Sequence, residues 1–151
     1  MMQNVRNFLR AAFPFLLTVA LWRLTLAIWN PAGILALIPI FFCTFVRPVP
    51  WFAPCGLLFC FLIDYNLGTP YVWTALWCVF YALNGFQTAF DLTRMEFDAL
   101  YAFLVFLSTG VLVLLIMNFA WGAFARALFA LLWSGALYIP ICTLIKRIGD
   151  D

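Results

Sequence analysis

The chain has 151 residues, of which 68% are apolar and only 9% are charged. A soluble domain carries about 25% charged residues, so the composition excludes a soluble globular protein and predicts an integral membrane protein. The formal net charge of +2 is too small to indicate nucleic-acid binding. Because the apolar runs are continuous rather than alternating, they favour membrane-spanning helices over a β-barrel.

At about 20 residues per crossing, the chain has room for five or six spans and no separate extramembrane domain. We therefore expect an all-α fold with about six transmembrane helices in one domain, residues 1–151. The expected spans are 11–29, 33–46, 52–64, 71–90, 97–118 and 127–145.

The first span follows a basic start that contains Arg6 and Arg10. Such a start is also typical of secretory signals, but no small-x-small cleavage site follows it, which favours an uncleaved helix. We expect this helix to begin around Pro14 and to end at Asn30-Pro31.

The second span is short and is expected to be broken by Pro39. It ends at Arg47-Pro48-Val49-Pro50, where two prolines exclude regular helix. The third span is too short to cross a core of about 30 Å upright, so it must include Asp64 and its neighbours or enter the membrane only partly. A short turn around Ala120-Trp121-Gly122 is expected between the last two spans.

The basic residues predict the orientation of the spans. With six spans and a cytoplasmic N-terminus, only Arg126 falls outside, whereas six basic residues fall on the cytoplasmic side, so the predicted topology is N-in and C-in. Those six are Arg6, Arg10, Arg47, Arg94, Lys146 and Arg147.

Asp64 is the only acidic residue before Asp91, and it directly follows an apolar run. A carboxylate at membrane depth is costly, so it needs a partner. Arg23 is one candidate, because it lies roughly 9 Å below the outer end of the first span, at a depth similar to that of Asp64. The alternative is that Arg23 reaches the membrane interface and that Asp64 caps its own turn through the Asn66 or Leu67 amides.

The hairpin 56–85, which contains Asp64, is expected to be the unit around which the other segments pack. Gly56 and Cys60 have the small-xxx-small spacing that allows close helix approach. The tryptophans and phenylalanines are expected to be mostly lipid-facing or interfacial. Scattered polar residues are interpreted as packing contacts rather than an ion path.

No catalytic residue, cofactor or metal site is expected. The chain has no histidine, and the five cysteines lie inside apolar runs without a CxxC pair. No serine or cysteine has an evident base beside it, which argues against nucleophilic catalysis. From the residues alone, we expect a non-enzymatic membrane scaffold whose helices bind other membrane segments and lipids.

The order of these features resembles the rod shape-determining protein MreD family. The matching features are Pro31, the segment LALIPIFF, Arg47-Pro48, Gly56 through Asp64, Gly68, and Leu132-Trp133 through Pro140 to Lys146-Arg147. Two positions depart from the family pattern. Cys60 stands where many relatives have a second glycine, and Val72 stands where a glycine often closes the hinge that contains Gly68 and Pro70.

The resemblance implies a non-enzymatic component of the cell-elongation machinery in the bacterial inner membrane. Its partners would be an MreC-like bitopic protein and, through it, the RodA glycosyltransferase, a class B penicillin-binding protein and MreB. The family fold is similar to the substrate-binding subunits of energy-coupling-factor transporters. The alternative function is therefore a vitamin-binding transporter subunit, with a polar cavity near Asp64.

Overall fold

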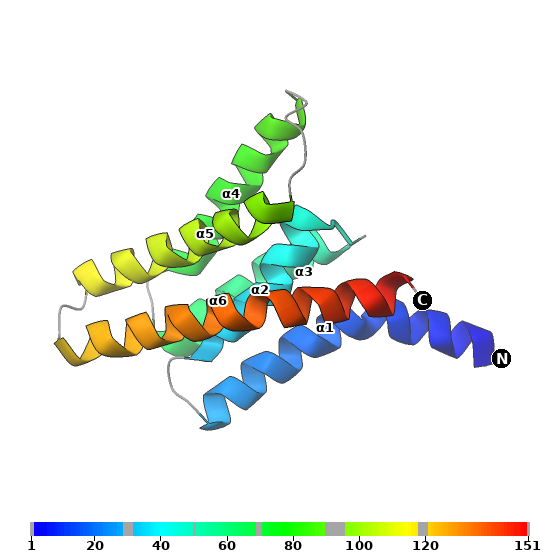
Figure 1. Ribbon diagram of the computed structural model, residues 1–151, viewed down its shortest axis with the longest axis horizontal. Helices are drawn as coiled ribbons and strands as arrows, with labels where there is room; N and C mark the ends of the chain where they lie inside the picture. The colour runs from blue at the N-terminus through cyan, green and yellow to red at the C-terminus, as the bar shows by residue number, and fades with distance from the viewer. Residues whose placement is uncertain are drawn as a thin grey trace.

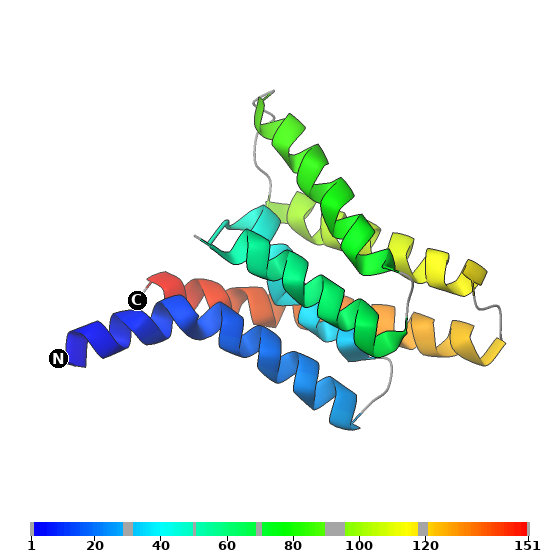
Figure 2. The ribbon, with the colours of Figure 1, turned by 180° about the vertical axis from the view of Figure 1, so that it is seen from behind.

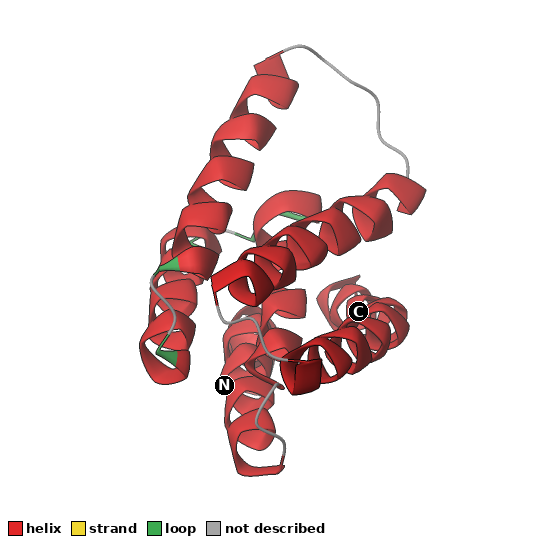
Figure 3. Cartoon of the chain, turned by 90° about the vertical axis from the view of Figure 1, so that its left-hand side faces the viewer, coloured by secondary structure: helices red, strands yellow, loops and turns green. Residues whose placement is uncertain are grey.

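The computed structural model describes residues 2–28, 32–49, 51–68, 71–89, 96–117 and 121–150, and every regular element in these ranges is helical (Figures 1 and 3). The elements are α1 (Met2–Ile28), η1 (Ala32–Ala36), α2 (Leu37–Phe41), η2 (Phe42–Val46), α3 (Phe52–Leu67), α4 (Val72–Ala89), α5 (Glu96–Met117) and α6 (Trp121–Asp150). The predicted all-α class is confirmed.

Three helical stretches are long and apolar enough to cross a membrane: Gln3–Arg23, Ala99–Met117 and Phe124–Asp150. Three shorter apolar stretches stand between them in the chain: Ile34–Val46, Phe52–Asn66 and Val72–Asn84. The helices thus indicate a multi-pass membrane protein. The third expected span, 52–64, corresponds to α3, which includes Asp64 and continues to Leu67.

Successive helical segments run in alternating directions, and the N- and C-termini lie at the same end of the molecule in both views of the ribbon (Figures 1 and 2). The end that holds the termini also holds the turn that follows η2, since Arg47 forms an ion pair with Asp150 near the C-terminus. Figures 1 and 2 also show α4 diverging from the other helices toward its C-terminal end.

The centre of the molecule is the segment 32–46 rather than the hairpin 56–85, which corrects the expectation from the sequence. Every residue of α2 is buried, and contacts reach this segment from α1, α3 and α6. Pro39 does not break it. Instead, the hydrogen bonding changes along the segment, from the 3₁₀ turn η1 through α2 to the π-helical η2, where the Arg47 N–H donates to Phe42 O.

Aromatic rings fill much of this core, which also corrects the expectation that most of them face lipid. The Phe41 ring lies 5.0 Å from that of Phe45, 5.4 Å from that of Phe103 and 5.5 Å from that of Phe106, measured between centroids. Phe80 joins the cluster edge-on, 5.0 Å from Phe106. Buried aromatic side chains contribute large apolar area, so they hold the central segment against α4 and α5.

Two proposed helix boundaries were wrong. Pro14 lies inside α1, which begins at Met2, and the helix bends partway along its length (Figure 2). A proline inside a helix removes one backbone donor and is an ordinary cause of such a bend. At the other end of the chain, Trp121 and Gly122 belong to α6, and that helix continues past Pro140 to Asp150.

Candidate functional site

The Asp64 hairpin consists of α3, the turn after it and α4. Gly68 ends α3 in the left-handed conformation, at φ +65°, and its N–H donates to the carbonyl oxygen of Asp64. A side chain at this φ is disfavoured in an L-residue, which is why helices so often end on glycine. The main chain of Asp64 therefore takes part in ending the first helix of the hairpin.

The Asp64 side chain begins the second helix of the hairpin. Its Oδ1 accepts from the Trp73 N–H at 3.1 Å, and its Oδ2 accepts from the Thr74 N–H at 2.9 Å and from the Thr74 hydroxyl at 2.7 Å. The first N–H groups of a helix have no partner within the helix, and their end of the helix is partially positive. Asp64 thus acts as the N-cap of α4, although it belongs to α3.

Burial makes this cap important. Asp64 is 1% exposed and Trp73 is fully buried, so water cannot replace the carboxylate as acceptor. A buried N–H without a partner costs about 1–3 kcal/mol, and a buried carboxylate without donors costs more. The carboxylate and the start of α4 therefore satisfy each other.

Tyr71 completes the turn in an unusual conformation. Its φ is +54°, which costs roughly 1–2 kcal/mol for a residue with a side chain. Its ring stacks on that of Phe61 in α3, with centroids 5.8 Å apart and planes at 23°. The ring contact and the Asp64 cap both hold the strained turn against α3.

Gly56 allows α3 to approach its neighbours. A Cβ at Gly56 would lie 3.1 Å from Thr44 Oγ1 and 3.3 Å from Trp77 Nε1, closer than most real contacts of this kind. Both atoms are buried and lack a hydrogen-bond partner in the part of the chain that is described. The glycine therefore leaves room for two polar groups in the middle of the core.

Gly110 allows α4 and α5 to approach each other closely. A Cβ there would lie 2.3 Å from Trp73 Cζ3 and 2.5 Å from Trp73 Cη2, so the indole ring rests directly on the glycine. Trp73 thus connects the Asp64 cap through its N–H to α5 through its ring. The sequence did not single out Trp73, Thr74 and Gly110 as one unit. The available signals were the proximity of Thr74 to a helix start and the small size of Gly110, which permits close helix approach.

The remaining predicted residues lie apart from this arrangement. The Arg23 side chain is exposed, and no ion pair joins it to Asp64 among the described side chains. Pro70 lies outside the described residues. Of the two departures from the family pattern, Cys60 is fully buried and Val72 is the first residue of α4, so both positions accept the larger side chain.

The geometry gives Asp64 an architectural role, because this residue closes one helix, starts the next and places Trp73 against α5. Comparison of the chain with family models, with curated proteins and with solved structures finds no match.

Proposed function

We propose that the chain is a non-catalytic inner-membrane scaffold of the cell-elongation machinery, which binds an MreC-like bitopic protein. One observation carries the proposal. Three of the residues that carry the resemblance to the MreD family, Gly56, Asp64 and Gly68, lie in the Asp64 hairpin, and each has a structural role there. A buried carboxylate used as a helix cap fits a scaffold better than a transport site.

The topology that we propose is six crossings with both termini in the cytoplasm, in a fold similar to the substrate-binding subunits of energy-coupling-factor transporters. Two features support it. The helical segments alternate in direction, and the two termini lie at one end (Figure 1). The ion pair of Arg47 with Asp150 links the predicted cytoplasmic turn to the C-terminus.

In this proposal the chain acts by presenting helices to other membrane proteins. The MreC-like partner would connect it to RodA, to a class B penicillin-binding protein and to MreB, and so to peptidoglycan synthesis along the cell wall. The exposed apolar side chains of α4, including Val79, Tyr81 and Leu83, are available to lipid or to a partner helix.

Depletion of the chain in its native rod-shaped cell tests the proposal. Cells are expected to become rounded and wider, and a plasmid copy of the wild-type chain should restore the rod shape. Unchanged width after complete depletion would contradict the proposed function. A defect in vitamin uptake with normal shape would instead favour the transporter subunit.

A further inference from the structure

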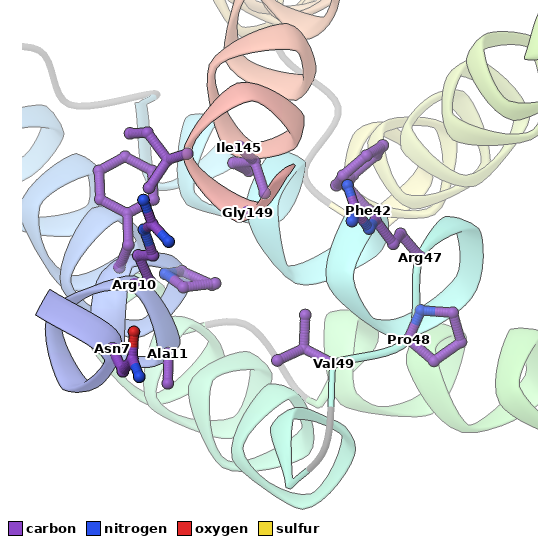
Figure 4. Close-up of a pocket in the computed structure, with 12 residues that line it drawn as sticks. Asn7, Arg10, Ala11, Phe42, Arg47, Pro48, Val49, Ile145 and Gly149 are labelled. Carbon is purple, nitrogen blue, oxygen red and sulfur yellow. The ribbon is translucent and has the colours of Figure 1, made fainter. Parts of the chain in front are cut away.

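A second candidate site lies at the opposite end of the spans from the Asp64 cap. It is a cavity of about 410 Å³ between the N-terminal part of α1, the turn after η2 and the last turns of α6 (Figure 4). Pockets of roughly 300–1,000 Å³ are typical of small-molecule sites. Each of the three segments contributes to the lining, which includes Arg10, Phe13, Phe42, Arg47, Val49 and Ile148.

The charged lining of the cavity is entirely positive. Arg10 and Arg47 lie on either side of the end of α6 in Figure 4, and no acidic residue belongs to the lining. Arg10 is only partly exposed and forms no ion pair with a described residue. A partly buried guanidinium facing a cavity favours an anionic ligand, and its planar fork suits a phosphate group.

Arg47 is held in position. One of its terminal nitrogens donates to Asp150 Oδ1, and both terminal nitrogens lie close to the backbone of Gly149, at 3.8 Å from the position of a Cβ. The hydrogen bond to Asp150 raises the pKa of the guanidinium still further, and an arginine is charged at every physiological pH. The bond to Asp150 uses one terminal nitrogen, and other N–H groups of the guanidinium stay available for a ligand.

The rest of the lining is largely apolar, including Phe13, Phe42, Val49 and Ile148. A free inorganic anion gains nothing from contact with apolar side chains. A phospholipid, in contrast, carries glycerol and acyl carbons next to its phosphate, and these carbons can contact the apolar lining. The lining residues lie near the ends of the expected spans, at 11, 46 and 145, and a site at the end of a span lies at the depth of lipid headgroups. Basic pockets between helices at this depth are known to bind anionic headgroups.

From these observations we propose that the cavity binds the headgroup of an anionic phospholipid, with Arg10 and Arg47 on the phosphate and the apolar walls on the glycerol and first acyl carbons. This site does not depend on the scaffold role, since it requires only that the end of the molecule with the termini lies at a membrane surface. The lipid would join α1, the turn after η2 and α6.

The test uses the purified full-length chain in detergent with equal amounts of phosphatidylglycerol and phosphatidylcholine, and counts retained lipids by native mass spectrometry. The wild type should retain phosphatidylglycerol selectively. Arg10→Gln should retain about fivefold less, as expected for one basic side chain beside an anionic headgroup. Arg10→Lys should keep most of the binding.

Arg126→Gln is the matched control, because it removes the same charge from an exposed arginine whose side chain bonds to Gly122 O in its own helix. Equal retention by Arg10→Gln and Arg126→Gln would overturn the proposal. Displacement of the lipid by inorganic phosphate would also overturn it, since the pocket would then be a general anion site. A melting curve of Arg10→Gln that matches the wild type shows that lost binding is not lost folding.

Discussion

Thr74 binds Asp64 twice: its backbone N–H and its hydroxyl both donate to Asp64 Oδ2, at 2.9 and 2.7 Å. The two residues belong to different helices, so these bonds fix the angle and register of the Asp64 hairpin. Helix propensity alone could not set this geometry, because the cap comes from outside the helix that it starts.

Asp64→Ala is expected to destabilise the chain by about 2 kcal/mol, since the Trp73 and Thr74 amides would lose their acceptor in a buried place. Asp64→Asn keeps one oxygen as acceptor and should cost about half as much. Unfolding in mixed micelles with increasing denaturing detergent measures the difference. A loss for Asp64→Asn as large as that for Asp64→Ala would mean that the charge, rather than the cap, stabilises the hairpin.

Thr74→Val removes only the hydroxyl and should cost about 1 kcal/mol. The double variant with Asp64→Ala should lose less stability than the sum of the two single losses, because both substitutions remove the same interaction. Thr109→Val is the control, since the Thr109 hydroxyl bonds to Val105 O within its own exposed helix. Full additivity of Thr74→Val and Asp64→Ala would argue against the bond.

Gly110→Ala should destabilise the contact between α4 and α5 by about 1–3 kcal/mol, because the new methyl group would overlap the Trp73 ring. Trp73→Phe removes the two ring atoms that would clash and should restore part of the loss in the double variant. Gly122→Ala is the matched control, as nothing lies within 4 Å of its Cβ position. Equal effects of the two alanine substitutions would show that Trp73 does not rest on Gly110.

Gly68→Ala should cost about 1–2 kcal/mol through backbone strain alone, because φ is +65° and no atom lies within 4 Å of a new Cβ. Gly68→Asn should cost less, since asparagine tolerates the left-handed conformation better. The same unfolding assay gives both values. The reverse order of the two variants would contradict the assignment of Gly68 as the left-handed end of α3.

The sequence predicted the hairpin because its signals are local: an acid after an apolar run, then glycine and proline. It could not identify the partner of Asp64, since a carboxylate can accept hydrogen bonds from the start of any helix within reach. The donors in the structure are the N–H groups of Trp73 and Thr74, nine and ten residues after Asp64. The hypothesis that Arg23 pairs with Asp64 assumed that a buried charge needs an opposite charge. In the structure, backbone N–H groups bind the Asp64 carboxylate. Equally, nothing in the sequence pairs Arg47 with Asp150, which are separated by 103 positions.

Burial of the aromatic residues was the other feature that could not be predicted from the sequence. A helix that is apolar on all sides has no pattern that separates its lipid-facing side from its core side. Phe41 and Phe106 are buried while Phe61 and Phe129 are exposed, although all four lie in apolar runs of the sequence. Tertiary packing alone distinguishes them.

A reporter fused after Asp151 tests the proposed topology. An enzyme that is active only in the cytoplasm should be active at this position, and a periplasmic reporter should be silent. A periplasmic signal would mean an odd number of crossings and would contradict the N-in, C-in topology.

The central claim, a scaffold that binds an MreC-like partner, is tested most directly by affinity purification of the tagged chain from its native membranes. We expect an MreC-like bitopic protein to co-purify with the wild type and with Gly122→Ala, and to be markedly reduced with Asp64→Ala at equal amounts of tagged chain. Recovery of a membrane ATPase module or a bound vitamin, without any such bitopic protein, would contradict the claim.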